Sequence, residues 1–136
     1  MTRTGRRVRA SLCCVLATCV LGGCSAGDDT AARSVAEQFL DAGAQRQGAQ
    51  ACSLLAPAAV RELEDASGAA CEQAILEEDL GAASGILDVQ VFDTMAQVRF
   101  ETDTMFLSRF DGEWLVIAAA CAPRPGHPYD CDIQVS

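Results

Sequence analysis

The hydrophobic period of the chain changes at Gly85, and this change limits the folds that it can adopt. Before Gly85, apolar residues in 31–47 recur every three or four positions, which is the spacing of an amphipathic helix. After Gly85, residues 86–92 alternate between apolar and polar, which is the spacing of a half-buried strand. A block of helices followed by a block of strands predicts an α+β fold.

Four helices are expected before Gly85. Thr30 has a side chain suited to an N-cap, and Gly48 is expected to break the first helix. Pro57 suits the first turn of a later helix, and Gly68 suits its end. The expected helices cover residues 31–47, 49–56, 57–66 and 71–79.

An antiparallel sheet of about four strands is expected after Gly85. Asp111-Gly112 is a strong signal for a tight turn between two of the strands. Residues 113–121 are apolar on both faces, which predicts a central strand covered on both sides. The expected strands cover residues 86–92, 95–101, 104–110 and 113–121, with a short final strand at 132–135.

Residues 1–23 have the pattern of a secretory signal peptide. Four arginines and no acid precede an apolar run at 10–21, which is shorter than the roughly 20 residues of a membrane-spanning helix. The letters LGGC at 21–24 resemble the lipobox of bacterial lipoproteins. The resemblance implies that Cys24 carries a diacylglycerol and becomes the first mature residue. The alternative is that Cys24 is an ordinary cysteine after an ordinary cleavage site.

This interpretation divides the chain and gives it a location. Residues 1–23 are the leader, residues 24–30 are the lipidated cysteine and a short tether, and residues 31–136 form a single α+β domain. The mature protein is expected on the extracytoplasmic face of the cell membrane, with the lipid bilayer as its first partner.

The mature chain is strongly acidic. Loss of the leader removes four of the ten basic residues and none of the 19 acids, so the net charge changes from −9 to −13. A surface of this charge does not attract nucleic acid or anionic lipid headgroups. We therefore expect no nucleic-acid partner.

Four cysteines besides Cys24 lie in the mature domain. Cysteines of exported proteins form disulfides, and four of them allow three pairings. We favour the two sequence-local pairs, because each closes a short loop between adjacent elements. The alternative is one zinc site, but no C-x-x-C spacing is present, and we expect no metal and no cofactor. The favoured pairs are Cys52–Cys71 and Cys121–Cys131.

Several stretches resemble small actinobacterial lipoproteins that carry a nuclear transport factor 2-like domain. These stretches are ACSLLAP at 51–57, FLSRFDGEWLVIAAAC at 106–121 and PYDC at 128–131. That family is also described as SnoaL-like or cystatin-like. The resemblance implies helices packed on a curved antiparallel sheet that encloses a conical pocket. Some members of the wider superfamily are isomerases or dehydratases, and many others only bind a ligand or a partner.

The candidate site is the proline-rich loop at 122–130. Its prolines restrict the backbone, so Arg124, His127 and Tyr129 form a preorganised candidate binding loop. The alternative is that the loop only connects two strands. No catalytic residue is assigned, because Asp88 is expected to point outward and a lone loop histidine is usually solvated.

The sequence therefore predicts a membrane-anchored, extracytoplasmic lipoprotein without catalytic activity. It would serve as a binding or accessory domain for an envelope protein partner or an apolar ligand. One alternative is a cone-fold enzyme, isomerase- or dehydratase-like, that acts on a small hydrophobic substrate. A second alternative is an accessory protein whose role depends on the lipid tether alone.

Overall fold

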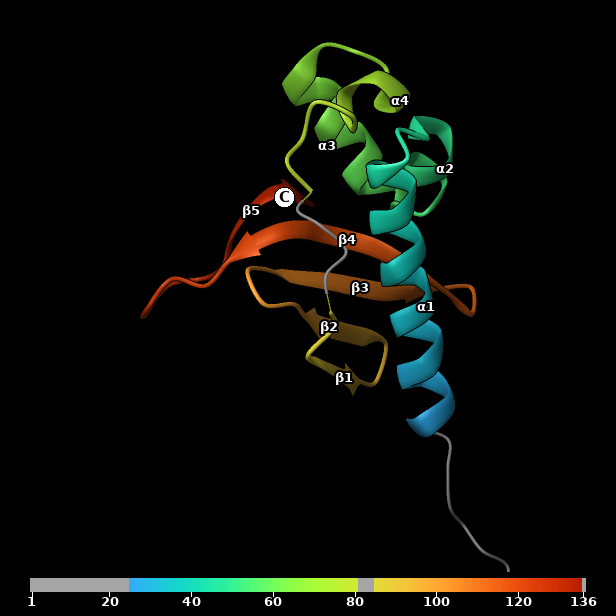
Figure 1. The fold of residues 1–136 in the computed structure, drawn as a ribbon, viewed down its shortest axis with the longest axis vertical. Helices are drawn as coiled ribbons and strands as arrows, with labels where there is room; N and C mark the ends of the chain where they lie inside the picture. The colour runs from blue at the N-terminus through green and yellow to red at the C-terminus, as the bar shows by residue number, and fades with distance from the viewer. Residues whose placement is uncertain (1–24, 81–84, 136) are drawn as a thin grey trace, which may run out of the picture.

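The computed structural model describes residues 25–80 and 85–135. Four helices are followed by five strands of one antiparallel sheet, so the α+β class is confirmed, with five strands where about four were expected (Figure 1). The leader and Cys24 lie outside the described residues. The elements are α1 (Ser25–Ala44), α2 (Gly48–Ser53), α3 (Pro57–Ser67), α4 (Cys71–Ala74), β1 (Asp88–Phe92), β2 (Met95–Arg99), β3 (Thr104–Phe110), β4 (Glu113–Ala122) and β5 (Asp130–Gln134).

Helix α1 begins at Ser25, so the expected N-cap at Thr30 was wrong, and residues 25–30 of the expected short tether are helical. The cause is a contact with a distant strand. Asp28 lies in the first turn of α1, where a carboxylate interacts favourably with the helix dipole, and it accepts a hydrogen bond from Arg109 of β3. This contact extends the helix toward its N-terminus by more than one turn.

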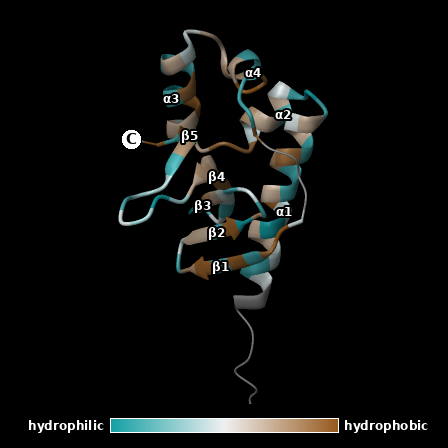
Figure 2. Cartoon of the chain, turned by 60° about the vertical axis from the view of Figure 1, so that its left-hand side comes forward, coloured by the Kyte–Doolittle hydropathy of each residue, from teal (hydrophilic) through white to brown (hydrophobic). Residues whose placement is uncertain are grey.

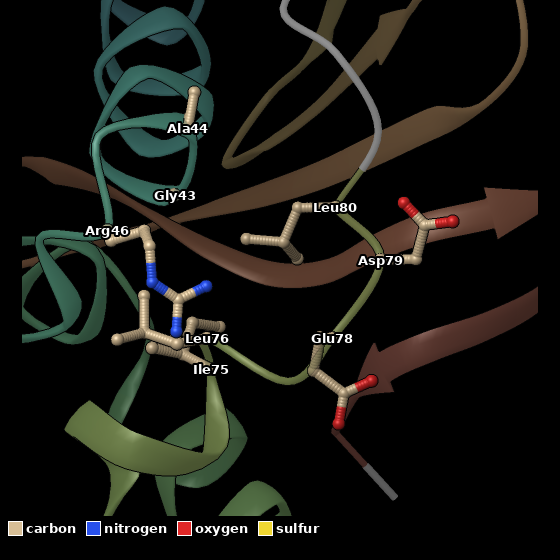
Figure 3. A pocket seen from close by; sticks show the side chains of 8 residues that line it. All are labelled: Gly43, Ala44, Arg46, Ile75, Leu76, Glu78, Asp79 and Leu80. Atoms are coloured by element: carbon tan, nitrogen blue, oxygen red, sulfur yellow. The ribbon is translucent and has the colours of Figure 1, made fainter.

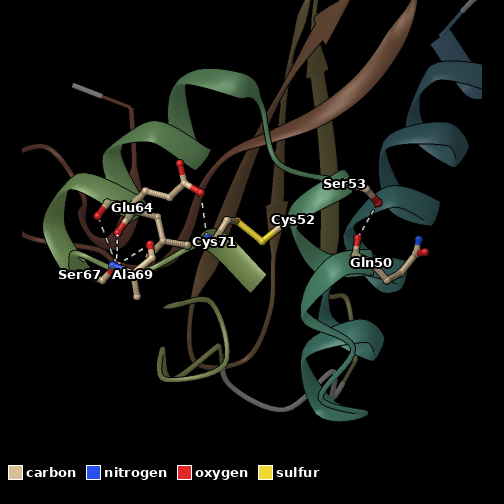
Figure 4. Close-up of a disulfide and its surroundings, with 8 residues drawn as sticks. Gln50, Cys52, Ser53, Glu64, Ser67, Ala69 and Cys71 are labelled. Atoms are coloured by element: carbon tan, nitrogen blue, oxygen red, sulfur yellow. Dashed lines mark hydrogen bonds between the residues drawn. A yellow bond between two sulfur atoms is a disulfide. The ribbon is translucent and has the colours of Figure 1, made fainter. Parts of the chain in front are cut away.

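Gly48 begins α2, and its role differs from the helix breaker that was expected. A Cβ atom on Gly48 would lie 2.0 Å from the carbonyl oxygen of Glu72, in α4. Glycine is needed here because two helix backbones approach each other closely. The Cys52–Cys71 disulfide joins the same two helices, with its Cα atoms 6.1 Å apart (Figure 4).

The ends of α3 are as predicted, whereas α4 is shorter than predicted. Pro57 occupies the first turn of α3, and Gly68 ends it in the left-handed conformation, with φ of 68°. The expected helix at 71–79 stops at Ala74. Residues 77–79 are all acidic, and carboxylates at a helix C-terminus interact unfavourably with the helix dipole.

The sheet is a simple meander in the order β1-β2-β3-β4-β5. Asp111 and Gly112 both have positive φ in the β3–β4 turn, so this tight turn is confirmed. The final strand is longer than expected and begins at Asp130, because it pairs with β4 through Cys121 and Cys131. Register shifts between β3 and β4 leave extra residues on β4, and Ala120 lies there with φ of 52°. Such bulges bend a sheet.

The connection between α2 and α3 is bonded to the first half of β4. The amide of Ala56 donates to the carbonyl oxygen of Val116 at 2.8 Å, and the amide of Val116 donates to that of Leu54 at 2.9 Å. These bonds form a short parallel bridge between Leu55 and Val116. They fix the helices against the sheet.

The core lies between the helices and one face of the sheet. Figure 2 shows α1 running alongside β1 to β4. Strand β4 was expected to be covered on both sides, and this was wrong, because Leu115 and Ile117 are only half-buried on the other face. The largest fully buried side chains are those of Phe39, Ile75, Met105, Leu107, Val98, Val116 and Cys121.

Candidate functional site

The loop at 122–130 projects from one end of the sheet and is held by a disulfide at its base. Cys121 of β4 and Cys131 of β5 are directly paired residues, and their Cα atoms are 3.9 Å apart. Both expected disulfides are therefore present with the expected pairing. In Figure 1 the loop lies on the left of the sheet, opposite α1. Residues 122–128 are exposed.

Tyr129 attaches the loop to the face of the sheet that the helices leave uncovered. Its hydroxyl oxygen accepts a hydrogen bond from the side-chain amide of Gln97 at 3.1 Å. Its ring meets the ring of Phe106 edge to face, with centroids 5.0 Å apart. Tyr129 is thus half-buried, and of the three candidate residues it supports the loop. Arg124 and His127 remain exposed.

The tip of the loop is a short turn that exposes the side chains of Arg124 and His127. The amide of His127 donates to the carbonyl oxygen of Arg124 at 3.1 Å, and Gly126 between them has φ of 74°. Arg124 also lies 3.8 Å from a carboxylate oxygen of Asp130. Both partners of this ion pair are mostly exposed, so it restrains Arg124 only weakly.

A depression of about 220 Å³ lies beside the loop. Its walls come from the β2–β3 connection and from the loop itself, through Pro123 and Tyr129. Asp103 lines it, and burial raises the pKa of this carboxyl above its ordinary value of 3.8, with a smaller contribution from the nearby Asp79. The loop and this depression together form one continuous surface, which we call the loop site.

A second pocket, of about 320 Å³, lies between the end of α1 and the chain after α4 (Figure 3). Burial, together with the charge of Asp132, raises the pKa of Glu78 above its ordinary value of 4.5. Figure 3 shows the carboxylates of Glu78 and Asp79 pointing away from the guanidinium of Arg46. A site for acid–base chemistry requires charged groups that converge on a common point, and the charged groups of this pocket do not.

The interior of the domain carries few polar groups. Thr104 is the one buried polar side chain among residues 25–80 and 85–135. Asp88, which was expected to point outward, forms an ion pair of 3.6 Å with Arg99 at the surface. Within the same residues, no group of three or more possible metal ligands is found. No helix of the described chain is both long and apolar enough to cross a membrane.

A cluster at the other end of the sheet was missed by sequence reasoning. The guanidinium of Arg109 is hydrogen-bonded to Asp28 and lies 4.6 Å from the ring centroid of Trp114, which is buried. The sequence contains a signal for it. Met105, Leu107 and Arg109 are each two positions apart, so Arg109 shares the core side of β3 with the two apolar residues, and a charge there needs a partner.

Compared with known proteins, the chain matches no family model, no curated protein and no solved structure.

Proposed function

We propose that this protein is a lipid-anchored, extracytoplasmic binding domain that presents the loop site to an envelope protein partner and has no catalytic role. The observation that carries the proposal is the rigid attachment of the loop. The Cys121–Cys131 disulfide closes its base, and Tyr129 is held by Gln97 and Phe106. A loop that is ordered before binding loses little conformational entropy when it contacts a partner.

The location is supported by the leader and by the disulfides. The LGGC motif stands in the signal-peptide context that lipidation requires, and two disulfides suit an oxidising compartment outside the cytoplasm. The resemblance to the nuclear transport factor 2-like cone is supported by a bent sheet with helices packed on one face. Because the described core is apolar, binding at the surface is better supported than chemistry inside the cone.

Site-specific photo-cross-linking in the native envelope tests the proposal. A photoreactive amino acid replaces His127 at the tip of the loop, and in a control protein it replaces Glu37, which is exposed on α1. We expect one discrete cross-linked protein from position 127 and none of the same mass from position 37. Arg124→Ala should weaken that cross-link, because it removes the exposed cation beside the tip.

Two results would contradict the proposal. One is the same cross-linking pattern from both positions, which would mean that the loop has no specific partner. The other is a small-molecule turnover that purified protein performs and that Asp103→Asn or Glu78→Gln abolishes. That result would favour the cone-fold enzyme.

A further inference from the structure

Exposed apolar side chains gather at the end of the sheet opposite the loop site. Phe92 is 60% exposed, Met95 40% and Phe110 41%. Phe92 and Met95 are directly paired across the β1–β2 turn, and Met95 is paired with Ser108, two residues before Phe110. The amide of Arg109 donates to the carbonyl oxygen of Thr94 at 2.8 Å, which holds the two turns together. We call these three side chains the turn patch.

Helix α1 brings the start of the mature chain to the same end of the molecule. Asp28, in the first turn of α1, is bonded to Arg109, the residue before Phe110. Cys24 directly precedes Ser25, the first residue of α1. Only residues 25–27 separate Cys24 from Asp28 in the chain. In Figure 1, α1 and the β3–β4 turn both lie at the right-hand end of the sheet.

A lipid on Cys24 would therefore hold the domain close to the bilayer surface. The helix begins at Ser25, and Asp28 in its first turn is bonded to β3, so only three residues separate Cys24 from a residue that is attached to the sheet. A bilayer that holds the lipid would also present its interface to the turn patch at high effective concentration. A contact between the turn patch and the bilayer that would be weak in free solution is populated at this effective concentration.

We propose that the turn patch is a membrane-contact surface and that Phe92, Met95 and Phe110 rest in the interfacial layer of the bilayer that carries the lipid of Cys24. This inference rests on the lipid anchor of the proposed function. It gives the domain a fixed orientation. The turn patch faces the membrane. The loop site lies at the other end of the ten-residue strand β4, roughly 30 Å from the patch.

The charges around the turn patch limit the depth of this contact. Asp93 and Asp111 stand at the tips of the two turns and are both exposed. Carboxylates do not enter the hydrocarbon core, so the aromatic rings reach the interface and no further. Anionic headgroups repel the same two carboxylates, and salt screens that repulsion.

Fluorescence quenching by brominated lipids tests the contact. The lipidated protein is placed in phosphatidylcholine vesicles with brominated or ordinary acyl chains, as Phe92→Trp and, as a matched control, Val135→Trp. Val135 is also an exposed apolar side chain, at 37%, but it follows β5 at the other edge of the sheet. The native Trp114 is 4% exposed and contributes the same background to both variants.

We expect the bromines to quench the Phe92→Trp protein several-fold more than the Val135→Trp protein, which should match wild type. Replacing half of the phosphatidylcholine with phosphatidylglycerol should reduce the quenching at low salt, and added salt should restore it. Equal quenching at both positions in protein that carries its lipid and sediments with the vesicles would overturn this inference and leave the lipid anchor intact. A mature protein whose mass lacks the diacylglycerol on Cys24 would overturn the anchor and the contact together.

Discussion

Gly48→Ala tests the close approach of α2 and α4. The substitution adds a Cβ atom 2.0 Å from the carbonyl oxygen of Glu72, 2.9 Å from its carbonyl carbon and 3.1 Å from its Cα. Real Cβ atoms essentially never come within 3.0 Å of such an atom, so the two backbones must separate by at least the missing 1.0 Å. The obstacle is backbone, and the Cys52–Cys71 disulfide ties the same two helices together. The separation therefore cannot be made by turning a side chain.

The expected loss of stability follows from two opposing effects. Overpacking a well-packed interior costs about 1–3 kcal/mol, and a rigid obstacle of this kind belongs at the upper end. Replacing glycine by alanine in a helix raises the free energy of unfolding by at most about 1 kcal/mol. The free energy of unfolding should fall by about 2 kcal/mol, which lowers Tm by roughly 10 °C in a domain of this size.

Urea unfolding followed by circular dichroism measures this change. Gly27→Ala is the control, because a Cβ atom on Gly27, in α1, would meet no other atom within 4 Å. The same substitution should there raise the free energy of unfolding by as much as about 1 kcal/mol. If Gly48→Ala is neutral or stabilising, the reasoning from the α2–α4 contact is refuted.

Three further predictions concern the disulfides, the Arg109 cluster and pH. Replacing either pair of cysteines by serine should lower the free energy of unfolding by about 3 kcal/mol, slightly more for the pair 19 residues apart than for the pair 10 apart, as measured in urea. Arg109→Met should cost about 1–2 kcal/mol through the lost ion pair and the lost contact with Trp114, and a double-mutant cycle with Asp28→Asn should show coupling; purely additive losses would contradict it. The raised pKa of Asp103 means that the folded state binds more protons than the unfolded state, so the free energy of unfolding should fall as pH rises from about 3.8 through the raised value. Asp103→Asn should remove that fall and leave stability unchanged below it, as a series of unfolding curves against pH would measure; an unaltered pH profile would contradict the assignment.

Features that depend on neighbouring residues could be predicted from the sequence. Pro57 and Gly68 mark the ends of α3, and Asp111-Gly112 marks a turn, because each acts through its own backbone angles. Features that depend on distant residues could not be predicted. The start of α1 is set by Arg109, which lies 81 residues from Asp28 in the chain.

The candidate loop shows both effects, because its local features could be predicted from the sequence and its distant contacts could not. Its prolines and its two flanking cysteines are visible in the sequence, so the restricted loop could be recognised. The partners of Tyr129 could not be recognised, because Gln97 is 32 residues away and meets the ring only through the register of the sheet. Tyr129, one of the three residues expected to contact a partner, therefore also holds the loop in place.

The bridge between Leu55 and Val116 also bears on aggregation. Strand β5 pairs with the second half of β4, from Ala118 onward, and the first half would otherwise present free amide and carbonyl groups on that side. Such an edge can pair with the same edge of another molecule. The segment 54–56 bonds the amide and the carbonyl oxygen of Val116, in this first half, within the chain. The β4 edge is therefore less available at this point as a template on which the sheets of two molecules could pair.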